Sequence, residues 1–304
     1  MNVFLHNFNP GSNSGPNKFC RQLFETLVKD YNVKIVTQQN DADIEFVSIN
    51  LQFEPVKPVV IRLDGIYFNS DQDYKTQNIP IKNSYDLANC VIFQTEFDKS
   101  LIESWFGQKE KNSFVIHNGP HEELINKAVQ IGGIDENTEV WCCASSWRPH
   151  KRLEENLRYF YEKAPEGAIM IIAGANPSKS VIDEFREKTK NRVFYAGELS
   201  YNDLISLYKR STTFVHLSYL DHCPNVVVDA QYAGCHIVCS STGGTSEVVN
   251  DATVIQEAVW DFGPTRLYEP PSMDFSNYYI VKTDKKKSLK EVAKDYYEAF
   301  QVLL

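Results

Sequence analysis

The sequence predicts an α/β protein built from two Rossmann-like domains, and three observations carry this prediction. The chain has 304 residues, which is more than a single hydrophobic core usually serves. Short apolar runs alternate with helical stretches, a pattern typical of parallel, doubly wound sheets. A polar turn, His-Asn-Gly-Pro at residues 117–120, separates two such series. We therefore expect domains at residues 1–118 and 119–287, followed by a helix at residues 288–304.

Charge and composition exclude several classes of protein. The net charge of −9 argues against a nucleic-acid-binding protein, which needs a basic face. No apolar run has the length of a membrane span, and the N-terminal strand lacks the basic flank of a signal peptide. The seven cysteines form neither a C-x-x-C pair nor a disulfide framework. We therefore expect a cytoplasmic protein with reduced, mostly buried thiols.

The first domain begins with a strand at residues 2–7, a glycine- and serine-rich turn, and a helix at residues 19–31. The amides of Gly11, Ser14 and Gly15 in this turn could wrap a phosphate. The glycine spacing does not fit the dinucleotide fingerprint G-x-G-x-x-G, so an ordinary strand-to-helix turn is the simpler interpretation. Further strands are expected at residues 33–37, 44–49, 59–63, 90–95 and 114–116.

Two acidic features of this domain are candidates for a role in binding. Asp41 and Asp43 form a D-x-D pattern of the kind that holds divalent ions in many glycosyltransferases. They precede a strand, away from the edge where open parallel sheets bind ligands, so we favour a solvated turn over a metal site. Asp64 instead follows the apolar run VVIRL directly, at the ligand-binding edge. Asp64 either contacts a ligand or caps the turn before Gly65, and both interpretations stay open.

The second domain repeats the alternation, with strands expected at residues 140–145, 168–173, 192–195, 213–217 and 235–240. After the first of these strands, Arg148, Lys151 and Arg152 lie at or before the start of a helix. Cations are unfavourable there because the helix dipole is positive at its N-terminus. We therefore interpret the three cations as an anion site, where each charge-assisted bond to a phosphate contributes roughly 1.5–3 kcal/mol. A solvated basic turn is the alternative.

Residues 216–249 hold the densest set of candidate functional groups. Asp221 lies in a polar loop after a strand, and Asp229 lies eight residues later in a short helix that Gly234 closes. A turn at Gly243 and Gly244 opens the next helical segment. Helix N-termini attract anions, and carboxylates accept hydrogen bonds from hydroxyl groups, so this stretch could hold a phosphate and a sugar together.

The periodicity fades after residue 254 through a Pro-rich loop segment. Lys285, Lys286 and Lys287 then precede the final helix, which carries its apolar side chains on one stripe. We interpret the lysines as a solvated helix end. Contact with a membrane surface is the alternative, so we expect any membrane association to be peripheral at most.

Together these features resemble the retaining glycosyltransferases of family 4, the glycosyl transferases group 1, which have the GT-B fold. In that family the second domain carries E-x7-E, a helix that ends in Gly, and a Gly-Gly turn followed by Glu. This chain is similar, with Asp221 and Asp229, then Ala233-Gly234, then Gly-Gly-Thr-Ser-Glu at residues 243–247. The resemblance implies two domains that face each other across a cleft. It also makes the C-terminal helix a candidate to pack back on the N-terminal domain.

The resemblance also implies roles for individual residues. Asp221 falls where the family contacts donor sugar hydroxyls near the reacting carbon, and Lys151 falls on its phosphate-binding lysine. Arg148 and Asp64 complete the candidate catalytic set. The residues expected to hold the donor, through its ribose, base, sugar or pyrophosphate, are Gly15, Gly197, Leu199, Pro224, Asn225, Val226, Asp229, Gly243 and Gly244.

The chain departs from the family pattern at four positions. Asp221 and Asp229 stand where the family has glutamates, and each is one methylene shorter. Ser146 stands where the family has an arginine, and Arg148 is the candidate to replace it. Asp64 stands where the family often has a histidine, so an anion there would bind a hydroxyl or stabilise positive charge on the sugar ring.

The function implied is retaining transfer of a sugar from a nucleotide-sugar, UDP- or GDP-linked, to a hydroxyl of a carbohydrate or glycoconjugate acceptor. The resemblance implies a front-face substitution that needs no metal and no other cofactor. One alternative is a sugar-nucleotide-binding subunit with weak or no activity, suggested by the aspartates and the missing arginine. Another is an epimerase or phosphorylase with the same fold. A nicotinamide dehydrogenase is the weakest alternative because the dinucleotide fingerprint is missing.

Overall fold

The computed structural model describes residues 1–12, 14–109, 112–283 and 287–304. The chain divides into two compact units. Unit 1 comprises Met1–Gly119, Asp261–Thr265 and Lys287–Leu304, and unit 2 comprises Pro120–Trp260 and Arg266–Lys286. Among the described residues, no helix is both long enough and apolar enough to span a membrane.

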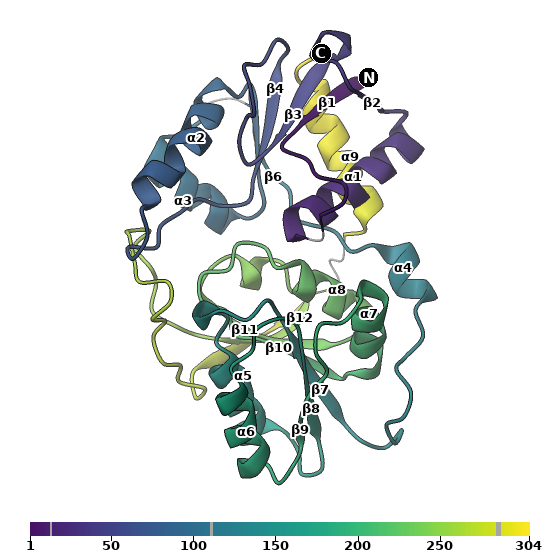
Figure 1. The fold of residues 1–304 in the computed structure, drawn as a ribbon, viewed down its shortest axis with the longest axis vertical. Coiled ribbons are helices and arrows are strands. Elements are labelled where there is room, and N and C mark those ends of the chain that lie inside the picture. Colours follow the sequence, from purple (N-terminus) through teal and green to yellow (C-terminus); the bar gives the residue numbers. More distant parts are fainter. Residues whose placement is uncertain (13, 110–111, 284–286) are drawn as a thin grey trace. The chain divides into compact units, whose positions relative to one another are not determined.

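Unit 1 is built on a six-stranded parallel sheet with the strand order β2-β1-β3-β4-β5-β6 (Figure 1). The strands are β1 (Asn2–His6), β2 (Lys34–Val36), β3 (Ile44–Ser48), β4 (Val59–Leu63), β5 (Cys90–Phe93) and β6 (Ser113–Val115). The connecting helices are α1 (Gly15–Tyr31), α2 (Tyr74–Leu87), α3 (Glu96–Phe106) and the short 3₁₀ helix η1 (Gln39–Asp41). Every residue of β3, β4 and β5 is buried, which explains why these strands are mostly apolar rather than alternating, with Glu45, Ser48 and Arg62 as the polar exceptions.

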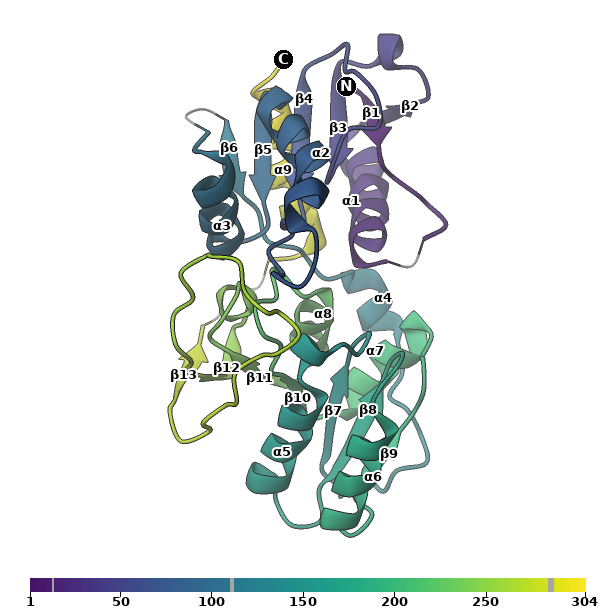
Figure 2. The same ribbon diagram turned by 60° about the vertical axis from the view of Figure 1, so that its left-hand side comes forward.

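The C-terminal helix α9 (Leu289–Gln301) completes the core of unit 1. Ser288 and Glu291 form a capping box that starts it. Its buried Tyr296 and Phe300 pack against Phe24 and other core side chains that α1 contributes. In Figures 1 and 2 the yellow α9 lies beside the purple α1. The helix therefore packs on the N-terminal domain, as expected, although it is shorter than the predicted 288–304. Of the three lysines before it, Lys285 and Lys286 lie outside the described residues, and Lys287 is exposed.

Unit 2 is built on a seven-stranded sheet with the order β13-β12-β11-β10-β7-β8-β9, seen in Figure 2. The strands are β7 (Val140–Ala144), β8 (Ile169–Ala173), β9 (Val193–Tyr195), β10 (Thr213–His216), β11 (His236–Ser240), β12 (Asp251–Ile255) and β13 (Tyr278–Lys282). The strands from β7 to β12 pair in parallel, whereas β13 is antiparallel to β12. The sequence pattern did not predict β13, because we expected a loop segment after residue 254.

Helices cover both faces of this sheet. They are α4 (Glu122–Lys127), α5 (Leu153–Lys163), α6 (Lys179–Lys188), α7 (Tyr201–Arg210) and α8 (Asn225–Ala233), with 3₁₀ turns η2 (Pro149–Lys151) and η3 (Thr245–Glu247). Cys142 of β7 joins the core beneath α7 and α8, while its neighbours Trp141 and Cys143 join the core beneath α5 and α6. Adjacent strand residues thus serve opposite faces. The two units confirm the predicted α/β class with two Rossmann-like domains.

The cysteines agree with the expectation of buried thiols. All seven are buried and free. Burial raises the pKa of Cys20 to about 11 and that of Cys90 to about 12, so both thiols stay protonated at neutral pH.

Candidate functional site

A cluster of polar side chains in unit 2 lies where the strand order reverses. The sheet runs outward from β7 in one direction and from β10 in the other, so the carboxyl ends of these two strands form the topological switch point where such sheets bind ligands. Lys151 follows β7 and Asp221 follows β10, and the Lys151 Nζ lies 2.5 Å from the Asp221 Oδ2. The His216 Nε2 lies 2.9 Å from the same oxygen. The structure therefore brings together two residues that are seventy positions apart.

Backbone bonds lock the loops that carry this pair. The Tyr219 amide donates to the His150 carbonyl at 2.8 Å, which ties the loop after β10 to the turn η2. Asn156 of α5 donates from Nδ2 to the Lys151 carbonyl at 3.0 Å, and its Oδ1 accepts from the Leu217 amide at 3.0 Å. Asn156 is almost fully buried, so its amide satisfies backbone groups that have little access to water. These hydrogen bonds thus fix the backbone of the segment that carries Lys151.

The electrostatics of the cluster favour an anionic Asp221 flanked by neutral imidazoles. Burial by itself would raise the pKa of Asp221, but the Lys151 charge and the His216 hydrogen bond hold that pKa well below its usual range. Burial lowers the pKa of His216 despite its bond to Asp221. Burial, reinforced by the Lys151 charge, lowers the pKa of His150 to about 3, and the His150 ring stacks on Tyr268 at 5.5 Å between centroids. At neutral pH Asp221 is therefore ionised and both histidines are neutral.

The predicted glycine turn at residues 243–244 lies against the Asp221 loop. The Gly244 amide donates to the Asp221 carbonyl at 2.7 Å. Gly243 has φ +82°, and a Cβ added there would lie 2.4 Å from the Asp221 carbonyl oxygen and 2.7 Å from its amide nitrogen. Only glycine permits that approach and that backbone conformation. The carboxyl ends of β10 and β11 therefore meet without a side chain between their loops.

The helix α8 carries the other predicted residues of this stretch. Pro224 caps its N-terminus, Asn225 and Val226 form its first turn, and Gly234 ends it in the left-handed conformation. Asp229 lies one turn further along α8 than Asn225 and is buried. The sequence prediction of a short helix closed by glycine is confirmed.

Three further predicted residues lie at the carboxyl edge of the unit 2 sheet. Arg148 precedes η2 and is exposed, and its carbonyl accepts from the Lys151 amide at 2.8 Å. Gly197 follows β9, and its carbonyl accepts from the Gly174 amide at 2.8 Å. Leu199 packs against the core beneath α7 and α8. Among them, Arg148 is nearest in sequence to Lys151.

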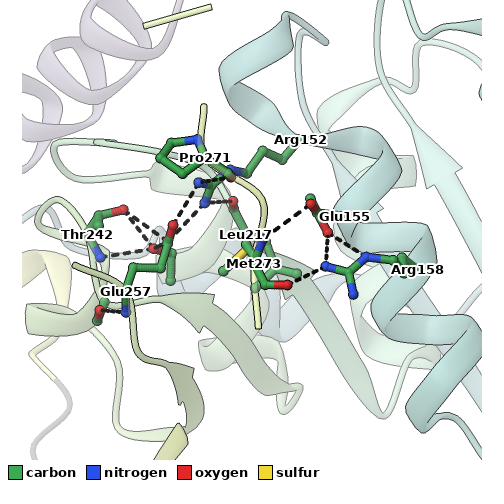
Figure 3. A network of polar contacts seen from close by, with 10 residues as sticks. Arg152, Glu155, Arg158, Leu217, Thr242, Glu257, Pro271 and Met273 are labelled. Atoms are coloured by element: carbon green, nitrogen blue, oxygen red, sulfur yellow. Dashed lines mark hydrogen bonds and ion pairs between the residues drawn. The ribbon is translucent and has the colours of Figure 1, made fainter. Parts of the chain in front are cut away.

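The interpretation of Arg152 as part of an anion site is wrong. Its guanidinium is buried and forms two bonds to the Glu257 carboxylate, at 2.9 Å and 2.7 Å, as Figure 3 shows. The charge pattern alone could not show that the Arg152 side chain is only 1% exposed, whereas the Lys151 side chain, which also has a carboxylate partner, is 17% exposed. Lys151 and Arg148 remain as the candidate phosphate-binding cations. Sequence reasoning also missed Glu257 and His216, which lie at the ends of strands, the position that could have marked them.

In unit 1, Asp64 lies at the carboxyl end of β4 within a buried polar network. Its Oδ1 accepts from Arg62 Nη1 and, at 2.8 Å, from Gln94 Nε2. Arg62 is also bound to Asn118 at 2.9 Å and to the Tyr296 hydroxyl at 3.1 Å. Asp64 therefore neutralises a buried arginine, in addition to any contact with a ligand. The sequence did not reveal Arg62 as a core residue.

The glycine- and serine-rich turn of unit 1 agrees with the interpretation as an ordinary strand-to-helix turn rather than a phosphate loop. The Gly11 amide donates to the Asn9 side chain at 3.0 Å, and the Ser14 amide donates to the Ser12 hydroxyl at 3.2 Å. These two amides therefore bind the loop's own side chains rather than pointing into a free nest. Gly15 is the first residue of α1, and residue 13 of this turn lies outside the described residues.

Asp41 and Asp43 lie in the turn before β3. The Asp43 Oδ2 accepts from the Asn2 amide at 2.7 Å, and the Asp41 carbonyl accepts from the Asn2 side chain at 2.9 Å. They therefore tie the start of β1 to this turn. Within the described parts of both units, no group of three or more His, Cys, Asp or Glu side chains is arranged to hold a metal ion.

Comparisons with known proteins agree with this geometry. Residues 125–260 match the model of the family described as glycosyl transferases group 1. No curated protein sequence matches the chain. Sucrose-phosphate synthase from Thermosynechococcus elongatus has a similar structure, with a TM-score of 0.68 and 13% sequence identity, over 99% of this chain and 97% of that one.

Two further similar structures contain nucleotides. HepE from Anabaena, solved in complex with UDP-glucose, has a TM-score of 0.61 and 15% identity over 99% of this chain and 90% of its own. The catalytic domain of starch synthase IV from Arabidopsis thaliana, bound to ADP and acarbose, has a TM-score of 0.56 and 12% identity. The match covers 95% of this chain and 78% of that one. At these identities the likeness establishes the fold, and the GT-B prediction is confirmed.

Proposed function

We propose that this chain, whose residues 125–260 match the glycosyl transferases group 1 family, is a glycosyltransferase that uses a nucleotide-sugar as donor. The observation that carries the proposal is the Lys151–Asp221 pair at the switch point of the unit 2 sheet. A cation for phosphate and a carboxylate for sugar hydroxyls are what a nucleotide-sugar needs. HepE is solved with UDP-glucose, and starch synthase IV with ADP, which supports a nucleotide donor.

In this proposal the donor pyrophosphate binds Lys151 and Arg148. Lys151 binds a phosphate oxygen while its bond to Asp221 weakens. The exposed Arg148 provides a second positive charge for the pyrophosphate. The amides of the turn at Gly243 and Gly244 and those at the start of α8 offer further donors. Asp221 accepts from hydroxyls of the transferred sugar, and Asp229 from those of the ribose. We propose a UDP- or GDP-linked sugar, with the base lying near Gly197 and Leu199.

We propose that the transfer retains the anomeric configuration and needs no metal. The acceptor oxygen forms its bond to the anomeric carbon on the face from which the pyrophosphate leaves. The bond between that carbon and the leaving phosphate oxygen breaks, and the acceptor proton passes to this oxygen. Lys151 and Arg148 stabilise the charge that develops on the leaving group, the task that a divalent ion performs elsewhere.

The acceptor in this proposal is a hydroxyl of a carbohydrate or glycoconjugate. Asp64 would contact a hydroxyl of donor or acceptor in addition to its bonds to Arg62 and Gln94. Any contact with a membrane surface would be peripheral and would involve the exposed Lys287.

A screen of nucleotide-sugars by thermal shift tests the donor proposal, because a bound donor raises the apparent stability by mass action. We expect one UDP- or GDP-sugar to raise the melting temperature in the presence of a chelator. Product analysis with that donor should give a glycoside with the donor's anomeric configuration. Binding without turnover on any acceptor would instead favour a sugar-nucleotide-binding subunit. An isomerised sugar or a sugar phosphate as product would favour an epimerase or a phosphorylase. Loss of activity on chelation, restored by Mn²⁺, would contradict the metal-independent mechanism.

A further inference from the structure

A buried ion pair lies directly behind the candidate site in unit 2. Arg152 and Glu257 form a two-pronged pair at 2.9 Å and 2.7 Å, and their side chains are only 1% and 7% exposed. Arg152 is the residue after Lys151, and Glu257 follows β12. Neither residue is among those to which a role in donor binding is assigned above.

Glu257 connects this pair to the glycine turn. Its Oε2 accepts from the hydroxyls of Ser240 and Thr242, the latter at 3.3 Å. Its own amide donates to the Ser241 hydroxyl at 2.9 Å. These three residues lead directly into Gly243 (Figure 3 labels Thr242 and Glu257). The carboxylate therefore fixes the segment that presents the turn.

Arg152 connects the pair to the loop that carries Asp221. Its Nη1 donates to the Leu217 carbonyl at 3.4 Å, and its guanidinium lies 4.9 Å from the centre of the Tyr219 ring. Its Nη2 also donates to the Pro271 carbonyl at 2.8 Å. One ion pair thus binds together the loops that follow β7, β10, β11 and β12.

The backbone at Arg152 supports a positional role. Its φ of +50° and ψ of 52° lie in the left-handed region, which is costly for a residue with a side chain. A glycine would adopt this conformation without cost, so the side chain itself must provide a compensating gain. The buried ion pair therefore holds Arg152 in this strained conformation, and the conformation fixes the backbone direction of the neighbouring Lys151.

We propose that Arg152 and Glu257 are positioning residues that set the distance between Lys151 and the turn at Gly243 and Gly244, and thereby determine affinity for the diphosphate of the donor. This inference rests on the proposed function. The pair acts through Lys151 and the turn rather than by touching the donor. Its loss should therefore weaken binding of the diphosphate and leave binding of the rest of the nucleotide nearly unchanged.

A neighbouring network supplies a matched control. Arg158 binds Glu155 within α5 and donates to the Met273 carbonyl at 2.6 Å, and the Met273 amide donates to Glu155 at 3.4 Å. Figure 3 shows both networks side by side. The Glu155 network fastens Met273, in the segment between β12 and β13, to α5, and it touches none of the loops after β7, β10 or β11. Glu155→Gln should therefore affect stability alone.

The test compares the affinities of a nucleoside diphosphate and its monophosphate, UDP with UMP or GDP with GMP, by calorimetry. For Glu257→Gln and Arg152→Lys, we expect the preference for the diphosphate to fall about tenfold, the equivalent of one charge-assisted bond. Monophosphate affinity should stay within about twofold, and Glu155→Gln should keep the full preference. Each variant is first shown to be folded by its cooperative thermal transition, and Arg152→Lys serves if Glu257→Gln does not fold.

Two results would overturn the inference. One is an unchanged diphosphate preference in the folded Glu257 and Arg152 variants. The other is an equal loss of preference in Glu155→Gln, which would indicate general loosening. Failure of the unmodified protein to bind either nucleotide would overturn the proposed function as well, so the two failures are distinguishable.

Discussion

Replacing Lys151 by alanine should weaken stability and donor affinity through separate mechanisms. The lysine is the cation bonded to Asp221, at 2.5 Å, and the two side chains are 17% and 14% exposed. Removing one partner of a fully buried pair costs about 3–5 kcal/mol, and the partial exposure of this pair reduces our expectation to about 2–3 kcal/mol. The loss arises because the Asp221 carboxylate would keep only His216 as its hydrogen-bond partner among the side chains of the cluster.

The loss of donor affinity follows from the bond to phosphate. One charge-assisted bond is worth about 1.5–3 kcal/mol, so Lys151→Ala should lower kcat/KM for the donor by about one to two decades. A nucleoside diphosphate is the sharper probe in a calorimetric assay, because it lacks the sugar that Asp221 is proposed to hold. The control is Lys163→Ala, at the exposed end of α5.

The double variant Lys151→Ala with Asp221→Asn separates the two effects. Without the charge at Asp221, the stability measured by urea unfolding should return to within about 1 kcal/mol of the unmodified protein. Nucleoside diphosphate affinity should stay at least about tenfold lower, since the phosphate ligand is still missing. Affinity unchanged in the single variant would refute the assignment of Lys151 to phosphate. Stability no better in the double than in the single variant would refute the argument from the ion pair.

The remaining predictions concern both units. Gly243→Ala and Gly133→Ala both force alanine to φ +82°, so each variant should lose about 1–2 kcal/mol of stability. Only the alanine at position 243 also meets the Asp221 backbone, so only that variant should lose nucleotide binding. Equal nucleotide affinities of the two variants by calorimetry would contradict this. His150 has a pKa lowered to about 3, so stability should be complete above pH 6.5 and fall by about 1.4 kcal/mol per pH unit between 6.5 and 3. Urea unfolding of His150→Asn at pH 4.5 and 7.5 should lack this contribution, and an unchanged pH dependence would argue against a neutral His150. Tyr296→Phe removes the hydroxyl that accepts from the buried Arg62, so thermal unfolding should show a stability lower by about 1–3 kcal/mol. An unchanged stability would show that water replaces the hydroxyl.

The sequence predicted the architecture because each unit follows its hydrophobic pattern closely. Strands such as β3 and β4 are buried along their whole length and are mostly apolar in sequence, apart from Glu45, Ser48 and Arg62. The helix α2 and the strand β13 are examples of elements that escaped this logic. The helix α2 contains Pro80, a residue that normally ends a helix. The edge strand β13 has Tyr278, Tyr279 and Ile280 all exposed, so it lacks the alternation of a strand with one buried face.

The candidate site was predictable in outline but not in its pairings. Family resemblance placed Lys151 and Asp221 in one site, and the glycine requirement at Gly243 follows from its backbone conformation. Which cation meets which carboxylate depends on strand register and on the loops after each strand, and a single sequence contains no direct signal for either. For that reason Arg152 was assigned to an anion site although it binds Glu257. Knowing which charged residues form a cluster does not show which cation pairs with which carboxylate.

The most direct test of the central claim is calorimetric titration of the unmodified protein and of Lys151→Ala with UDP- and GDP-sugars in the presence of a chelator. The proposed function predicts that one donor binds the unmodified protein without a metal ion and binds the variant at least about tenfold more weakly. Absence of binding to every nucleotide-sugar, or equal binding to both proteins, would contradict it.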